Sequence, residues 1–254
     1  MLLRKPVFEY YLMATLKAMR WFLLIWAGIF VLTTTGLSAI QVGTATVNGA
    51  NFSGGEGAFL FFFFIAMMSD FTAEMHFLFQ HGVSRRAAFG GMVSLIFVSG
   101  AIWAATLMVT NVLFGAIGSL VDVNAYGDMF PTLYSGWLET VGAVPEILMT
   151  FAFYWGALIM AGILGYFISI LFNKLSKTGK MILGGAAIAL AIALPMVNTI
   201  AGGRLVQFAL WFGRVFVGPG AVANPWRGIC VFLVIAAIFL VPSWLMIRRM
   251  KLKK

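Results

Sequence analysis

Residues 88–117 read AFGGMVSLIFVSGAIWAATLMVTNVLFGAI and contain no Asp, Glu, Lys or Arg. A helix needs about 20 predominantly apolar residues to cross the hydrocarbon core of a bilayer. The apolar side chains of this stretch do not alternate with polar ones, as they would in a strand of a membrane barrel. Because backbone groups in lipid must find hydrogen-bond partners within the protein, we expect the stretch to form a transmembrane helix.

The composition of the whole chain agrees with this stretch. Of the 254 residues, 62% are hydrophobic and 10% are charged, and the mean hydropathy is +0.99. A soluble domain carries roughly 25% charged residues, so lipid has to be the solvent for this chain. The single cysteine, Cys230, excludes an intrachain disulfide. The sequence therefore predicts an all-α, polytopic membrane protein.

Six apolar runs are candidate transmembrane helices within a single transmembrane domain, residues 1–254. They are residues 21–40, 53–72, 88–117, 147–172, 181–200 and 228–247. The second run is the least regular, because its apolar centre at Ala58–Met68 is short. This run has to include polar ends, which places Glu56 and Asp70 near opposite faces of the membrane. No segment between the runs is long enough to form a soluble domain.

The distribution of positive charge orients the predicted bundle. The net charge is +9, and with six spans only Arg204, Arg214 and Arg227 fall on the side away from the termini. Because Lys and Arg concentrate on the cytoplasmic side, we expect a multi-pass protein of a bacterial cell membrane with both termini cytoplasmic. The positive charge then reports topology, and we expect lipid but no nucleic acid as a partner. A signal peptide is the alternative for the first run, although the region before it is long for that.

Enzyme motifs are mostly missing from the sequence. The fragment Lys177–Met181, KTGKM, lacks the upstream glycine and the Ser or Thr of a phosphate-binding loop. His76 and His81 are spaced too far apart to share one helix face as a zincin pair. We therefore predict no catalytic residue, no metal site and no cofactor bound by this chain.

The N-terminal segment, residues 6–20, has the pattern of an amphipathic helix. Its apolar residues recur at helical spacing, and its charged residues fall on another face. The apolar set is Phe8, Leu12, Leu16 and Met19, and the charged set is Glu9, Lys17 and Arg20. We expect an interfacial helix at the inner membrane surface before the first span. It acts either as a plain anchor or as a lever that contacts a cytoplasmic partner.

The predicted cytoplasmic loop between the second and third runs carries bulky apolar residues. A short helix over Glu74–Gln80 would present Met75, Leu78 and Phe79 together. Gly82 would end this helix and Ser84 would cap the next one. These apolar side chains require a cover, which is either the bundle itself or another protein.

The order of this loop resembles that of the ABC type-2 (type V) exporter permeases: a short helix, then Gly82-Val83-Ser84-Arg85-Arg86, then an aromatic residue that opens the third span. The chain length, the interfacial helix, the six runs and the long segment before the last run resemble the same family. The resemblance implies that the loop is a coupling helix, which docks on a separate cytosolic ABC ATPase present in two copies. ATP and Mg²⁺ would bind to that ATPase, and two permeases, identical or related, would form one pathway. The implied coupling residues are Glu74, Met75, Leu78, Phe79, Gln80, Gly82, Ser84, Arg85 and Arg86.

Two further segments lie on the predicted outer side. Residues 201–227 are too apolar for a free loop and too short for two spans. The resemblance implies a re-entrant helical segment here, with Arg204, Trp211, Phe212 and Arg214 as its main residues; an interfacial helix without a transport role is the alternative. Residues 118–146 contain four acidic residues and no Lys or Arg, and we expect a solvated loop rather than a binding site.

The sequence thus favours the permease subunit of an ATP-driven exporter of peptides, antibiotics, lipids or other amphipathic molecules. A self-contained secondary transporter or channel is the main alternative. It would require ionisable groups deep in the spans, and the predicted spans place almost none there. A membrane-embedded enzyme or assembly factor is a third possibility, for which the sequence offers no clustered catalytic set.

Overall fold

The structure of the chain is a computed structural model that describes residues 4–34, 55–69, 82–120, 129–176 and 224–249, together with positions 178, 179, 181, 193, 203, 204, 207 and 211. These residues form helices and no strands. The helices are α1 (Arg4–Thr34), α2 (Gly55–Ser69), α4 (Arg85–Leu120), α5 (Met129–Leu138), α6 (Ala143–Lys174) and α9 (Pro225–Arg248). The predicted all-α class is therefore confirmed for the described part of the chain.

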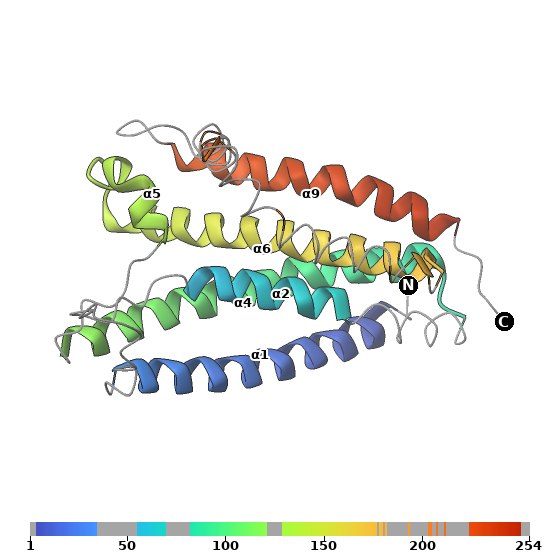
Figure 1. The fold of residues 1–254 in the computed structure, drawn as a ribbon, viewed down its shortest axis with the longest axis horizontal. Coiled ribbons are helices and arrows are strands. Elements are labelled where there is room, and N and C mark those ends of the chain that lie inside the picture. Colours follow the sequence, from blue (N-terminus) through green and yellow to red (C-terminus); the bar gives the residue numbers. More distant parts are fainter. Residues whose placement is uncertain are drawn as a thin grey trace.

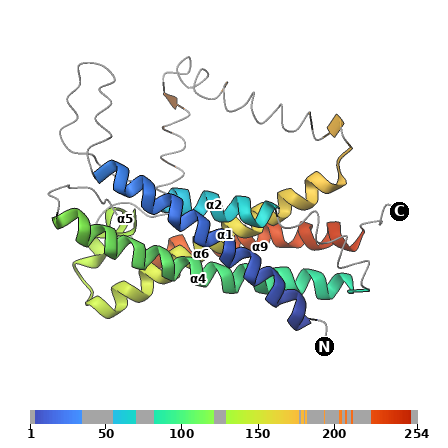
Figure 2. The ribbon, with the colours of Figure 1, turned by 90° about the horizontal axis from the view of Figure 1, so that it is seen from below.

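The long helices lie side by side in one bundle, with α6 near its centre (Figures 1 and 2). Ring contacts pair Phe153 with Phe232 and Phe167 with Phe239, so α6 and α9 run in the same direction. Helix α2 also runs in this direction, whereas α1 and α4 run in the opposite one (Figure 1). The short helix α5 lies at the end of the bundle where α6 and α9 begin.

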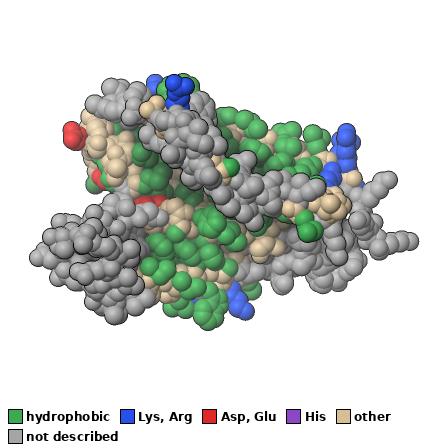
Figure 3. All heavy atoms as spheres, in the orientation of Figure 1, with side chains coloured by type: hydrophobic (Ala, Val, Ile, Leu, Met, Phe, Trp, Pro, Cys, Tyr) green, Lys and Arg blue, Asp and Glu red, His purple; other side chains and the backbone are tan. Residues whose placement is uncertain are grey.

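Three of the described helices are long and apolar enough to cross a membrane. They comprise Arg85–Ile117, Ala143–Lys174 and Pro225–Arg248. Apolar side chains cover much of the described surface seen in Figure 3, as a lipid environment requires. The structure is thus compatible with a helical membrane protein, but the described residues show three such helices rather than the predicted six.

The other three predicted spans differ for separate reasons. Helix α2 is described over 15 residues, fewer than a span needs, and the remaining residues of the predicted span 53–72 lie outside the described part of the chain. The predicted span 21–40 enters the described part only as the second half of α1. Nearly all of the predicted span 181–200 lies outside the described residues.

Helix α1 corrects the predicted separation between an interfacial helix and the first span. The structure shows one continuous helix of 31 residues over Arg4–Thr34. The only proline is Pro6 in the first turn, and the only glycine is Gly28 in the second half, so no residue near position 20 favours a break. The charged residues Glu9, Lys17 and Arg20 are exposed, while Phe8 and Leu12 pack against the core.

Helix α5 corrects the prediction of a solvated loop over residues 118–146. Phe130 and Tyr134 of this helix are fully buried, against Phe153 of α6. The helix is kinked at Tyr134, where φ is −123° and ψ is 28°. Residues 129–138 of this segment are therefore packed on the bundle, because burial of the two aromatic side chains stabilises the contact with α6.

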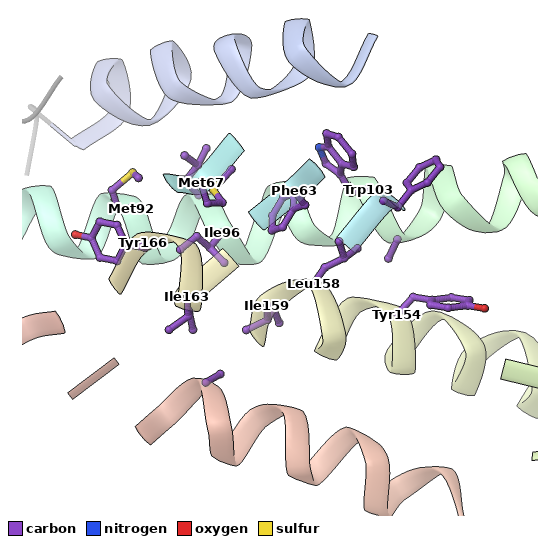
Figure 4. Packing of buried hydrophobic residues seen from close by; sticks show 14 of the residues in the cluster. Phe63, Met67, Met92, Ile96, Trp103, Tyr154, Leu158, Ile159, Ile163 and Tyr166 are labelled. Atoms are coloured by element: carbon purple, nitrogen blue, oxygen red, sulfur yellow. The ribbon is translucent and has the colours of Figure 1, made fainter. Parts of the chain in front are cut away.

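The core forms where α2 and α4 meet α6. A Cβ atom on Gly162 would lie 2.7 Å from the Phe63 ring and 2.9 Å from Ile96 Cγ2, and one on Gly165 would overlap the carbonyl oxygen of Phe64. Glycine at these two positions lets the backbones of α2 and α6 approach closely. Figure 4 shows Phe63 and Ile96 lying together over α6.

Aromatic rings join α1 to α2 and α4. The Phe22 ring of α1 lies 4.8 Å from that of Phe59 and 5.6 Å from that of Trp103, measured between ring centroids. Phe59 and Trp103 are also in contact, at 5.9 Å. This cluster fixes α1 to the bundle through ring packing, which suits aromatic pairs at these separations.

Candidate functional site

The only carboxylate among the buried residues of the described chain belongs to Glu56, in the first turn of α2, which is 2% exposed. Its Oε1 atom accepts a hydrogen bond from the backbone N–H of Met129 at 3.0 Å. It also accepts from Asn111 Nδ2 at 3.5 Å and from the Tyr154 hydroxyl at 3.4 Å. These donors come from α5, α4 and α6, so one oxygen atom joins four helices. We call Glu56, Asn111, Met129 and Tyr154 the glutamate cluster.

Two neighbouring groups complete the geometry of the glutamate cluster. The Tyr154 hydroxyl, besides donating to Glu56, accepts from the backbone N–H of Phe130 at 3.4 Å. Asn111 is 7% exposed, and its Oδ1 atom is buried without a hydrogen-bond partner in the described part of the chain. A buried acceptor of this kind costs about 1–3 kcal/mol unless another group satisfies it.

The glutamate cluster lies at the start of α5, where this helix is attached to the bundle. The N–H of Met129 is one of the donors that the first turn of a helix leaves without an intrahelical partner, and Glu56 supplies the acceptor. Two further residues bind α5 to the bundle: Phe130, next to Met129, packs on Phe153, and the Tyr134 hydroxyl, one turn later, reaches the first turn of α9 beside Gly228. Burial raises the pKa of Tyr134 to about 12, so its phenol stays neutral at ordinary pH.

Sequence reasoning did not identify Glu56 as a functional candidate. It placed this residue near a membrane face and counted almost no ionisable group deep in the spans. The structure adds that Glu56, in the first turn of α2, is buried among four helices. An isolated glutamate in a glycine-flanked apolar run, Gly55-Glu56-Gly57, was the available clue.

At the opposite end of α4, residues Gly82–Arg86 form a turn that we call the arginine turn. Gly82 has a φ of +76°, the left-handed region that glycine adopts without strain. Ser84 caps α4 as the sequence predicted, since its Oγ accepts from the backbone N–H of Ala87 at 3.2 Å. Arg85 and Arg86 follow directly and are exposed.

The arginine turn is attached to the end of α9. Arg85 Nη1 donates to the carbonyl oxygen of Arg248 at 2.8 Å. That carbonyl belongs to the last turn of α9, where helix carbonyls lack partners and cations are favoured. One turn further along α4, the Phe89 ring lies 5.1 Å from that of Trp244 of α9. The turn and the end of the last helix therefore form one local unit.

Several predicted site residues lie outside the described residues. These are Glu74, Met75, Leu78, Phe79 and Gln80 of the predicted coupling helix, and Phe212 and Arg214 of the predicted re-entrant segment. For the predicted interfacial helix, Leu16 is half-buried like Phe8 and Leu12, and Lys17 is exposed.

Before Asn224, the predicted re-entrant segment is described at four positions. Gly203 has a φ of +80°, and its carbonyl oxygen accepts from the backbone N–H of Gln207 at 3.0 Å. Arg204 and Trp211 are exposed, with 57% of Trp211 accessible. The glycine marks a helical turn beginning at Arg204.

In the described part of the chain, no three His, Cys, Asp or Glu side chains lie close enough together to hold a metal ion. Comparison of the chain with models of protein families, with curated proteins and with solved structures gives no match in any of the three.

Proposed function

We propose that this chain is the membrane-spanning permease subunit of an ATP-driven exporter of the ABC type-2 class. A separate cytosolic ATPase would bind ATP and Mg²⁺, and its closure would displace the permease. Two permeases, identical or related, would form the pathway for a peptide, an antibiotic, a lipid or another amphipathic molecule. The proposal treats the chain as a transport subunit without catalytic residues of its own.

The arginine turn is the observation that carries this proposal. Arg85 and Arg86 are exposed directly after a left-handed glycine and a serine cap, so two cations stand at a rigid helix start. Arginine is enriched where protein interfaces concentrate their binding energy. The contact from Arg85 to Arg248 means that a force applied to this turn would reach α9 as well as α4.

The proposal includes six spans with both termini in the cytoplasm. Helix α6 ends and α4 begins at the end of the bundle where α9 also ends, while α9 starts at the α5 end (Figure 1). Since α6 and α9 run in the same direction, an odd number of crossings between them is needed, and the apolar run 181–200 can supply one. Arg85, Arg86 and Arg248 then share the cytoplasmic side, as the distribution of charge in membrane proteins favours.

Orientation can be tested with two matched serines. In a Cys230→Ser background, Ser135→Cys on α5 should react with an impermeant thiol reagent added outside intact cells, and Ser176→Cys after α6 should not. Both serines are exposed. Labelling at position 176 but not at 135 would reverse the proposed orientation.

The function itself is tested by purification in mild detergent from the native host. We expect an ATPase with a phosphate-binding loop to copurify with the chain, and Arg85→Ala with Arg86→Ala to reduce its recovery while the permease remains folded. Recovery of the permease without any ATPase, together with transport that does not require ATP, would reject the proposal.

The buried Glu56 favours one alternative, a self-contained transporter driven by an ion gradient. Ionisable groups inside membrane proteins commonly belong to ion pathways. The purified chain also allows the two functions to be distinguished. In vesicles that contain this chain alone, transport by the alternative would respond to an imposed pH gradient.

A further inference from the structure

Glu56 has hydrogen-bond donors arranged for its ionised form. Three donors from three helices, Met129 N–H, Asn111 Nδ2 and the Tyr154 hydroxyl, converge on Oε1 at 3.0–3.5 Å. Donors to a carboxylate stabilise its charge. The surroundings act in the other direction, since removal of a carboxylate from water favours the neutral acid. Both charge states of this group therefore have a source of stabilisation in the folded protein.

The neutral acid needs an acceptor for its O–H group, and Asn111 can provide one. Its Oδ1 is buried without a partner in the described part of the chain, on the same amide group whose Nδ2 contacts Glu56. An amide carries a carbonyl acceptor and an NH₂ donor on one planar group. Rotation of the side-chain amide by half a revolution exchanges the positions of Oδ1 and Nδ2. Asn111 can therefore donate to the carboxylate or accept from the acid.

We propose that Glu56 and Asn111 form a proton-binding site whose occupancy controls how firmly α5 is held on the bundle. On protonation, a hydronium ion of the solvent gives up one proton to the Glu56 carboxylate and leaves as water, and the new O–H donates to Asn111 Oδ1. No other covalent bond changes. This site is a further property of the chain and does not depend on the identity of a partner ATPase.

Among the described groups around the site, Glu56 is the one that changes charge. Helix α4 presents the neutral amide of Asn111, and α6 presents the neutral phenol of Tyr154. Helix α5 presents the backbone of Met129, beyond which the Tyr134 phenol is neutral up to a pKa of about 12. Helix α1 presents aromatic rings to α2, including that of Phe22. Asp128 directly precedes Met129 in the sequence and lies outside the described residues.

Protonation changes the hydrogen bond that anchors α5. Hydrogen bonds to an ionised group are roughly twice as strong as those between neutral groups. The bond from Met129 N–H to Glu56 is the polar contact at the start of α5, and Phe130 and Tyr134 follow it into the core. With a neutral Glu56, the equilibrium constant for local opening of α5 rises by about five-fold, which is the change expected when one charge-assisted hydrogen bond is weakened.

Infrared spectroscopy of the full chain in lipid vesicles tests the proton site directly. Between about pH 4 and pH 9, the range of ordinary and buried glutamates, we expect a protonated-carboxyl band that titrates. Glu56→Gln should remove this band, and Asn111→Leu should shift its frequency by removing the acceptor. Glu146→Gln is the matched control, since Glu146 occupies the first turn of α6 and is only half-buried. If the spectra of wild type and Glu56→Gln carry the same titrating bands, the proposal is wrong.

Hydrogen–deuterium exchange of residues 129–138 tests the effect on α5. After correction for the intrinsic pH dependence of exchange, wild type and Glu146→Gln should exchange about five-fold faster at low pH. Glu56→Gln imitates the neutral acid, with one donor and one acceptor, and should exchange at the fast rate at every pH. A corrected wild-type rate that does not change with pH would overturn the proposal, even if Glu56→Gln failed to fold.

Discussion

The two ends of the bundle handle their charged groups in opposite ways. In the glutamate cluster, one buried carboxylate is surrounded by donors from three other helices. In the arginine turn, Arg85 and Arg86 remain exposed, and Arg85 makes a hydrogen bond to the end of α9. In Figure 3 the acidic side chains visible on that face lie toward the α5 end, whereas Lys and Arg side chains are visible at both ends.

The difference follows from how water competes at each site. A buried carboxylate that loses its donors keeps the full cost of its lost hydration, whereas an exposed guanidinium that loses a partner returns to water. Substitutions in the glutamate cluster should therefore reduce the stability of the bundle. Substitutions in the arginine turn should leave the bundle stable and alter what it binds.

The largest effect is expected at Glu56. Glu56→Ala removes the acceptor for Met129 N–H and the Tyr154 hydroxyl, each of which costs about 1–3 kcal/mol when buried without a partner. The free energy of unfolding should fall by about 3 kcal/mol or more, measured by thermal or denaturant unfolding in detergent. Glu139→Ala, at an exposed position after α5, should change it little. Equal effects of the two substitutions would remove the contrast between buried and exposed charge.

The second effect concerns packing beside the glutamate cluster. A Cβ atom on Gly228 would lie 2.6 Å from the Tyr134 hydroxyl and 3.2 Å from Phe153 Cε2. Gly228→Ala should therefore destabilise the bundle by about 1–3 kcal/mol, the usual cost of overpacking.

Tyr134→Phe provides a stringent check on this packing effect. The Tyr134 hydroxyl is buried and has no hydrogen-bond partner among the described residues, so its removal alone should be neutral or stabilising. Combined with Gly228→Ala, it should restore most of the lost stability. A double variant no more stable than Gly228→Ala alone would mean that the hydroxyl is not the obstacle.

A smaller effect is expected from the helix cap in the arginine turn. Ser84→Ala removes the acceptor for Ala87 N–H at the start of α4 and should cost about 1 kcal/mol. Ser94→Ala is the matched control, because that exposed serine bonds only to the preceding turn of the same helix, at Gly90. Melting temperatures of the two variants would distinguish a cap from a general effect of losing a hydroxyl.

The smallest effect on stability is expected at Arg85. Its bond to the last turn of α9 contributes about 0.5 kcal/mol, typical of a cation near a helix C-terminus at a surface. Arg85→Ala should melt within a few degrees of wild type, and Arg86→Ala should match it. Under the proposed function both variants should still lose affinity for the ATPase. A loss of stability as large as that of Glu56→Ala would show that the two ends do not differ.

Local sequence signals predicted the main helices and the arginine turn. The predicted spans 88–117, 147–172 and 228–247 fall inside α4, α6 and α9, since long uncharged apolar runs leave few other structures in lipid. The cap by Ser84 was predictable because the bond to Ala87 spans three residues. The glycine at position 82 likewise acts through its own backbone angle.

What only the tertiary structure decided depends on contacts between distant residues. The described partners of Glu56 are 55, 73 and 98 residues away in the sequence, so the flanking glycines could mark this residue but could not show which donors surround its carboxylate. The burial of α5 likewise depends on Phe153 and on the absence of a side chain at Gly228. Composition predicted a lipid solvent and helical secondary structure. The environment of Glu56, the one buried carboxylate among the described residues, depends on which helices meet around it, because solvation is set by neighbours in three dimensions.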